Sequence, residues 1–312
     1  MPAGLNNEII YSIVVTYNGQ EWIEKCLNSL TKSSVTSNII VIDNGSTDET
    51  VETIKTQFSN CQLIETKENL GFGKANNIGL SIALKNQADF VFLLNQDAWV
   101  EVNTIEDLIN AQKKNPQFEI LSPIHLNGDN TQLDYLFSIF IEPRKCPDLY
   151  SDIYFNKTSD KIYETEFVNA AAWLMTKNCL NTVGGFSPIF YHYGEDNNYC
   201  LRARYHNLKI GVYPLTKIYH DKDYTPTDYD KTESLRNRQK LVFYSDPIMN
   251  DQLENDIYVY KMSAVKSLFK LQITNYKKHL VTYRNLKGIQ NTIGEYVNQS
   301  KLRTSSFLDR IN

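Results

Sequence analysis

Short apolar runs alternate with segments of helical periodicity through the first hundred residues. The runs 9–16, 39–42 and 90–94 are bounded by polar residues, which is typical of strands that are buried on both faces of a sheet. Between them, residues 20–30 and 46–58 carry apolar side chains at helical spacing. Strands and helices that alternate at short, regular intervals predict an α/β fold with a doubly wound, mainly parallel sheet flanked by helices.

The pattern weakens between residues 122 and 166, where loops rich in Asn, Asp and Pro alternate with aromatic residues. Beyond that region we expect a strand over 167–175 and a short helix over 178–183. Two further short strands are expected at 210–213 and 218–220. The rest of the chain is helical in period, which predicts a domain over residues 1–230 and a helical C-terminal extension over 231–312.

Three polar turns follow the expected strands of the N-terminal half: Thr16-Tyr17-Asn18, Asp43-Asn44-Gly45 and Asn95-Gln96-Asp97. The carboxyl ends of parallel strands lie at one edge of a sheet, so these turns must cluster where α/β sheets bind ligands. Asp97 is a candidate ligand for a divalent cation that holds a diphosphate, or else a cap of the next helix. Asp43 suits a hydrogen bond to a ribose or a base, and equally an Asx turn leading into Gly45.

Further candidates for chemistry lie in the second half of the chain. Glu195 and Asp196 follow Gly194 at the start of an expected helix. Adjacent carboxylates point in different directions, so one can be anchored while the other faces a cavity as a base. A solvated helix N-terminus, which favours acidic residues, is the alternative. His220 ends a short strand and is either a structural histidine or a metal ligand.

A glycine-rich segment runs from Gly71 through Gly73 to Gly79 and opens a helix. The N-terminus of that helix, together with Lys74, could attract an anion. Its spacing is not the dinucleotide fingerprint, and such glycines more often allow a loop to pack tightly on a sheet.

The composition is that of an ordinary globular protein, with 42% apolar and 22% charged residues in 312. The five cysteines are odd in number and form no C-x-x-C pair, which favours reduced thiols in the cytoplasm over a zinc site or a disulfide framework. The start of the chain, with Glu8 in its first apolar run, is not typical of a signal peptide. No stretch approaches the roughly 20 apolar residues that cross a bilayer.

Charge is distributed unevenly. Residues 261–303 hold nine Lys or Arg and one acidic residue, Glu295, whereas the remainder holds 23 basic and 35 acidic residues. Between Val265 and Tyr283 apolar residues fall at helical spacing with basic residues among them, which predicts a basic amphipathic helix. Such a helix is typical of peripheral contact with a membrane, here its cytoplasmic face. Packing on the rest of the chain, or on a second copy in a homodimer, is the alternative.

Seven stretches of sequence carry a resemblance to a known family: SIVVTYNG at 12–19, VIDNGSTD at 41–48, NLGFGKANNIG at 69–79, LNQD at 94–97, VGGF at 183–186, GED at 194–196, and His220. In this order they resemble the family 2 glycosyltransferases, which are inverting enzymes with the GT-A fold. The resemblance spans roughly residues 9–225 and is closest to the rhamnosyltransferase-like branch that builds bacterial surface polysaccharides.

The resemblance implies an enzyme that moves a sugar from a nucleotide-sugar donor, such as dTDP-rhamnose or a UDP-hexose, to a hydroxyl of a glycan or lipid-linked acceptor. It implies Mg²⁺ or Mn²⁺ held by Asp97, as the last residue of an Asp-x-Asp motif, and by His220. Asp196 would be the catalytic base with Glu195 beside it. We expect no nucleic-acid partner. The expected donor-binding residues are Thr16, Tyr17, Asn18, Asp43, Asn44, Lys74, Asn76, Asn95 and Gln96, and the expected acceptor-binding residues are Trp173, Tyr191 and Tyr193.

One position departs from the family pattern. Asn95 stands where the metal motif has its first Asp, so only one carboxylate is available to the cation. Two other functions remain open: a nucleotidyltransferase that makes sugar nucleotides, and a non-catalytic module that binds a sugar or a nucleotide. The turn after the first strand lacks the Gly-rich, basic loop of the former, and the Glu195-Asp196 pair opposes the latter.

Overall fold

The computed structural model describes residues 8–222, 233–249 and 251–308. Its centre is a nine-stranded sheet in which four parallel strands form one half, in the order β3-β2-β1-β4. These strands are β1 Ile10–Thr16, β2 Asn38–Asp43, β3 Gln62–Glu65 and β4 Phe90–Asn95. All four carboxyl ends therefore lie at one edge of the sheet.

The other half of the sheet is mixed. Strand β8 runs antiparallel to β4, and the order continues through β6 and β9 to β5, with β7 also paired to β9. The bounds are β5 Ala98–Val100, β6 Phe118–Asn127, β7 Tyr163–Thr165, β8 Ala172–Thr176 and β9 Lys209–His220. The expected α/β class, with a central sheet flanked by helices, is confirmed. Four of the described strand pairings are parallel and four are antiparallel, so the sheet is mixed rather than mainly parallel.

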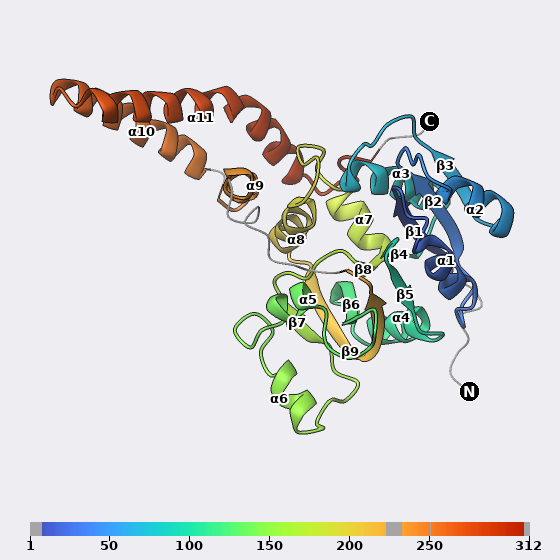
Figure 1. Ribbon diagram of the computed structural model, residues 1–312. Helices are drawn as coiled ribbons and strands as arrows, with labels where there is room; N and C mark the ends of the chain where they lie inside the picture. Colours follow the sequence, from blue (N-terminus) through green and yellow to red (C-terminus); the bar gives the residue numbers. More distant parts are fainter. Residues whose placement is uncertain (1–7, 223–232, 250, 309–312) are drawn as a thin grey trace.

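Helices cover both faces of the sheet (Figure 1). Neighbouring residues of β1 point to opposite faces: Ile13 belongs to one buried core and Val14 to the other. The first core packs under α3, α7 and α8, and the second under α1, α2 and α4. Two covered faces explain why the strands are continuous apolar runs. The helices are α1 Ile23–Thr31, α2 Thr50–Gln57, α3 Phe72–Lys85, α4 Thr104–Lys114, α5 Tyr135–Phe140, α6 Leu149–Tyr154, α7 Lys177–Val183 and α8 Glu195–Tyr205.

Three expectations for local structure need correction. The strand expected over 167–175 begins only at Ala172. The strands expected at 210–213 and 218–220 are the two ends of one strand, β9. Between them residues 214–216 form a bulge without partners in β6, and Pro214 has no N–H to donate there. Strand β6 falls partly in the segment that showed no clear pattern.

The C-terminal region forms α9 Glu233–Tyr244, α10 Asp251–Phe269 and α11 Ile273–Ser300. Helices α10 and α11 lie side by side as a hairpin that projects away from the sheet (Figure 1). The single amphipathic helix expected from Val265 to Tyr283 is therefore wrong, because the chain reverses between the two helices. Among the described residues no helix is both long and apolar enough to cross a membrane.

After the hairpin the chain returns to the sheet domain. Gly185 N donates to Ser306 O at 2.8 Å, and the side chain of Asn77 donates to Phe307 O at 3.1 Å. The expected link around residues 225–230, and with it the domain boundary at 230, lies outside the described residues. The division into two domains stays a prediction.

Candidate active site

The three polar turns meet at the carboxyl edge of the sheet. Gln96 Oε1 accepts hydrogen bonds from Thr16 Oγ1 at 2.7 Å and from Tyr17 N at 2.8 Å. Asn44 N donates to Thr16 O at 2.7 Å, and Asn18 N donates to Ser46 Oγ at 2.9 Å. Residues far apart in the sequence are thus tied into one polar layer at the strand ends, as parallel strands require.

A cavity of about 410 Å³ opens above this layer. The expected site residues that line it are Tyr17, Asn44, Asn95, Gln96, Asp97, Tyr191 and Tyr193. We refer to this cavity as the strand-end pocket.

Three of the expected donor-binding residues are buried and do not line the strand-end pocket. Thr16, Asp43 and Asn76 are each at most 2% exposed. Thr16 bonds to Gln96, and Asn76 donates to the Phe72 carbonyl within its own helix at 3.0 Å. The Asp43 carboxylate accepts from the backbone N–H groups of the turn that follows it, at 3.2 and 3.3 Å, which is the Asx turn. These side chains support the wall of the pocket from behind.

The glycine-rich segment allows the 190–194 loop to pack closely against the start of α3. A Cβ atom on Gly71, whose φ is +83°, would lie 1.9 Å from the carbonyl oxygen of Tyr191, so only glycine lets the 190–194 loop approach α3. Lys74 lines a different hollow, together with residues 299–308 of the C-terminal return. The expected anion site with Lys74 is therefore not part of the strand-end pocket. Asn18 accepts from Thr47 N at 2.8 Å and is likewise used within the loops.

Asp97 and His220 form the candidate metal pair. Asp97 Oδ1 lies 3.3 Å from His220 Nε2, and the other ring nitrogen, Nδ1, lies 3.0 Å from Asp134 Oδ2. A carboxylate on the far side of a ligating imidazole is the usual arrangement around protein metals. Burial alone would lower the pKa of His220, but hydrogen bonds to Asp134 and Asp97 outweigh it and raise the pKa to about 9. Burial opposes ionisation of Asp97, yet His220 and Lys222 hold its pKa below the ordinary value.

One carboxylate and one imidazole fit a cation that completes its shell with diphosphate oxygens and water. Within residues 8–222, 233–249 and 251–308 no group of three or more His, Cys, Asp or Glu side chains is arranged to hold a metal by itself. The pair therefore suits a metal that arrives with a phosphate ligand.

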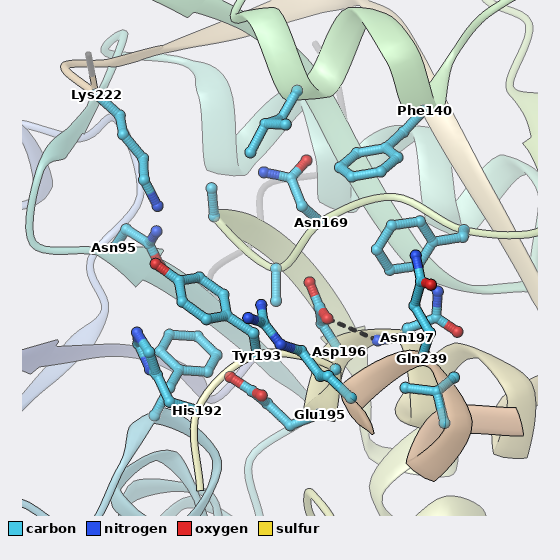
Figure 2. A pocket seen from close by; sticks show the side chains of 18 of the residues that line it. Asn95, Phe140, Asn169, His192, Tyr193, Glu195, Asp196, Asn197, Lys222 and Gln239 are labelled. Carbon is cyan, nitrogen blue, oxygen red and sulfur yellow. Dashed lines mark hydrogen bonds between the residues drawn. The ribbon is translucent and has the colours of Figure 1, made fainter. Parts of the chain in front are cut away.

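A second cavity, of about 440 Å³, lies next to the first and contains Asp196. We refer to it as the base pocket. Figure 2 shows the Asp196 carboxylate pointing into the cavity toward Asn169, whereas the Glu195 carboxylate points toward His192. Gly194, with φ of +95°, and the start of α8 set these directions. Asp196 Oδ1 also accepts from Asn197 N at 2.7 Å, which holds the carboxylate in place.

The surroundings of Glu195 and Asp196 favour the protonated forms of their carboxyl groups. Burial, and then the charge of Asp196, raise the pKa of Glu195 to about 7. Burial also raises the pKa of Asp196, against the backbone amides of Asn197 and Ala170, which stabilise its charge. Glu195 Oε2 and Asn169 Oδ1 are buried without a hydrogen-bond partner among the described residues. Unpaired buried oxygens beside a carboxylate with a raised pKa are typical of a site that acts on a ligand.

Trp173 does not face either pocket, contrary to expectation. It is fully buried in the core, where its ring stacks on Phe186 at 6.1 Å and lies 5.7 Å from the ring of Tyr199. The residue sits within β8, where successive side chains alternate between faces, and its face of the sheet is covered by helices. Tyr191 and Tyr193 are exposed and lie on the loop between the pockets.

Several residues of the site escaped the sequence analysis, among them Asp134, Lys222 and Arg238. Asp134 caps α5 through Oδ1, accepting from Phe137 N at 2.7 Å, while its Oδ2 faces His220. Lys222 lines both pockets. Arg238 of α9 lies in the base pocket, with its guanidinium 4.7 Å from the Tyr193 ring centre. The proximity of Lys222 to His220 in the sequence was an available signal, but nothing in the sequence brings Asp134 or Arg238 to the site.

The two pockets adjoin, and we refer to the pair as the hollow. Phe72, Asn95, His192, Tyr193 and Lys222 line both of them. Asp97 lines the strand-end pocket, and Asp196 lines the base pocket. The hollow therefore has one half lined by the strand ends and a second half that contains two carboxylates.

Comparison with known proteins agrees with this geometry. The sequence model described as Glycosyl transferase family 2 matches residues 12–175, more than half of the chain. A low-salt glycan biosynthesis hexosyltransferase of Haloferax volcanii is 21% identical over 91% of this chain and 92% of its own length. A dTDP-rhamnosyl transferase of Shigella flexneri is 23% identical over 69% of each chain.

Among solved structures, the Staphylococcus aureus protein TarS, residues 1–349, in complex with UDP-GlcNAc, superposes with a TM-score of 0.55 at 16% identity, covering 94% of this chain and 88% of that one. This likeness confirms the fold, and the family match identifies the chemistry class. The chain belongs to glycosyltransferase family 2 and is a transferase with the expected GT-A architecture and rhamnosyltransferase-like relatives.

Proposed function

We propose that this enzyme transfers a sugar from a nucleoside diphosphate sugar to a hydroxyl of a glycan or lipid-linked acceptor, with inversion at the anomeric carbon. The observation that carries the proposal is the shared hollow, with Asp97 in one half and Asp196 in the other. The donor diphosphate lies in the strand-end pocket, and the acceptor enters the base pocket.

In this mechanism the Asp196 carboxylate accepts the proton of the acceptor hydroxyl as the oxygen attacks the anomeric carbon. A new carbon–oxygen bond forms on one face of the sugar while the bond to the diphosphate breaks on the other, so one displacement inverts the centre. The direction in which the Asp196 side chain points and its raised pKa suit a general base. Glu195 stands beside it, and its unpaired oxygen is available to an acceptor hydroxyl.

Asp97 and His220 would hold Mg²⁺ or Mn²⁺ against the donor. When bound, the cation neutralises charge on the departing diphosphate as a Lewis acid. Lys222 lines both halves of the hollow and adds a positive charge beside the leaving group. Asn44, Gln96 and Tyr17 would contact the nucleoside end of the donor.

The relatives support a role in the assembly of a surface glycan, with dTDP-rhamnose or a UDP-hexose as donor. Several apolar side chains, among them Leu136, Phe140, Phe167 and Val242, line the base pocket. They suit the ring faces of a sugar or the first carbons of a lipid carrier. We therefore propose a cytoplasmic enzyme that meets its acceptor at the membrane surface.

A donor panel tests the proposal. UDP, dTDP and GDP are first ranked by thermal shift with and without Mn²⁺, and the matching sugar nucleotides are then incubated with simple glycoside acceptors. We expect one nucleotide to stabilise the protein, more strongly with Mn²⁺, and its sugar to appear in product with the opposite anomeric configuration by NMR. Product that retains the donor configuration would overturn the single-displacement mechanism. Absence of any nucleotide-dependent shift would overturn the donor site.

A further inference from the structure

The tip of the α10–α11 hairpin is an apolar projection. Phe269 and Leu271 are 84% and 81% exposed, more than any other large apolar side chain among the described residues. Leu268 and Ile273 flank them and are about half exposed. Nothing in the described part of the chain covers this tip, which lies at the far end of the hairpin from the sheet (Figure 1).

The turn at the tip places a leucine where helices usually place glycine. Leu271 N donates to Leu268 O at 3.0 Å and Gln272 N donates to Ser267 O at 2.9 Å, the two bonds of a Schellman motif. Leu271 occupies the left-handed position of this motif with φ of +54°. A branched side chain is strained there and, being exposed, gains no packing in return. The folded chain alone gives no reason for this leucine.

The charge around the tip is of one sign. Residues 257–294 contain seven Lys or Arg and no Asp or Glu, while the rest of the chain holds 25 basic and 36 acidic residues. None of these seven cations forms an ion pair with a described carboxylate. Lys266, Lys270, Lys277 and Lys278 lie within about two helical turns of Leu271, roughly 10 Å along the axes.

Only the base of the hairpin has an apolar core of its own. Leu253, Ile257, Leu286, Ile293 and Val297 are buried together with Tyr244 of α9. Toward the tip the buried positions between the helices are small, Ala264 and Ser267, and the larger apolar side chains of Val265, Leu268 and Phe269 are exposed. The rigid base holds the tip away from the sheet on an arm whose longer helix, with 28 residues, measures about 42 Å.

We propose that residues 268–273, the hairpin tip, insert into the interface of an anionic lipid bilayer while the four neighbouring lysines contact the headgroups. This partner rests on the proposed function, in which the acceptor lies at a membrane. Apolar side chains that reach the acyl boundary and lysines that remain at the headgroup level are the standard arrangement of an interfacial anchor. The acidic remainder of the chain is repelled by the same surface, so the tip is the part that faces the membrane.

A second copy of the chain fits the tip less well. Pairing two tips would bring together two cationic segments that carry no compensating carboxylate, which is unfavourable at physiological ionic strength. Charge complementarity therefore selects a negatively charged surface.

Co-sedimentation with vesicles tests the proposal without donor or acceptor, so its outcome does not depend on glycosyl transfer. The full chain should sediment with vesicles of phosphatidylcholine mixed with phosphatidylglycerol, and not with pure phosphatidylcholine. Each lysine neutralised, for example Lys270→Gln or Lys277→Gln, should weaken binding about fivefold. Wild-type protein that stays in the supernatant with anionic vesicles at low salt would overturn the proposal.

The decisive variant is Phe269→Ser combined with Leu271→Gly. Glycine relaxes the turn, so this protein should unfold at no lower temperature while vesicle binding falls at least tenfold. The matched control is Tyr154→Ser with Phe155→Ser, an exposed aromatic pair at the C-terminal end of α6 beside Lys157, and it should bind like wild type. Light scattering runs in parallel: a dimer that only the tip variant loses, with no vesicle binding by wild type, would assign the tip to a second copy instead.

Transfer assays separate this proposal from the proposed function. The tip variant should transfer sugar to a water-soluble acceptor at the wild-type rate and lose activity only on an acceptor embedded in anionic vesicles. Equal activity of wild type and variant on the embedded acceptor, with equal vesicle binding, would contradict the role of the tip and leave the transfer mechanism intact.

Discussion

The two halves of the active-site hollow are built differently. The polar groups of the layer beneath the strand-end pocket are bonded to one another: Gln96 joins Thr16 to Tyr17, and Asp43 closes its own turn. In the base pocket Glu195 Oε2 and Asn169 Oδ1 have no described partner, and the carboxylates have raised pKa values. The first half is a pre-organised scaffold, and the second half holds unsatisfied groups that a ligand would satisfy. The difference separates residues that build the site from residues that act in it.

The largest expected effect concerns the base. Asp196→Asn keeps the size of the side chain but removes the proton acceptor, so the turnover rate should fall about 100- to 10,000-fold. Binding of the nucleotide, measured by calorimetry with UDP or dTDP and Mn²⁺, should be unchanged because the strand-end pocket is untouched. Asp129→Asn, in an exposed turn, is the matched control and should behave like wild type. Turnover near the wild-type rate in the Asp196 variant would refute the assignment of the base.

The second expected effect concerns the buried carboxyl group of Glu195. Its pKa is about 7 in the folded protein and 4.5 as the reference value, so between these pH values the unfolded chain releases the proton while the folded protein keeps it. The free energy of unfolding therefore falls by about 3 kcal/mol in total as the pH rises from 4.5 to 7. Glu195→Gln cannot ionise and should lack this loss.

Urea unfolding at pH 5, 6 and 8 measures the difference. The variant should gain on wild type as pH rises, with most of the gain complete by pH 8. A difference between the two proteins that does not change with pH would mean that Glu195 is ionised in the folded state at neutral pH, and would remove the contrast between the two pockets.

The third prediction tests the scaffold. Gln96→Leu leaves the buried Thr16 Oγ1 and the more exposed Tyr17 N without their acceptor. Such a loss costs about 2 kcal/mol of unfolding free energy, and nucleotide affinity should fall with it. Gln117→Leu, at an exposed position, is the control in the same chemical denaturation experiment. If Gln96→Leu is as stable as its control, the polar layer at the strand ends is not a rigid scaffold.

The smallest expected effect concerns Asp134. Its carboxylate faces Nδ1 of His220 and leaves Nε2 directed at Asp97. Asp134→Asn can still cap α5, but its amide would favour the wrong imidazole tautomer, so Mn²⁺ affinity in the presence of nucleotide should fall about 10- to 100-fold. Titration followed by electron paramagnetic resonance measures bound Mn²⁺ directly. An unchanged affinity would show that Asp134 serves only as a helix cap.

The sequence predicted the parallel half of the fold and its polar turns closely. Strands buried on both faces are continuous apolar runs, and their ends are marked by the polar residues that follow, such as Asn95 to Asp97. It predicted the other half poorly, because β6 to β9 and the short helices depend on pairing between distant segments. Trp173 shows why. The sequence places it near the site residues along the chain, but the face of the sheet to which its side chain points depends on the register of β8 with β4.

The amino-acid sequence by itself determined the α/β class, the clustering of the strand ends and the Glu195-Asp196 pair at a helix start, because local periodicity and turn chemistry encode them. Only the tertiary structure decided which side chains face the hollow, that Arg238 lines it and Asp134 contacts His220, and that a basic helical segment folds back on itself to expose an apolar tip. Those outcomes depend on long-range packing and on the burial of individual atoms, which no local pattern specifies.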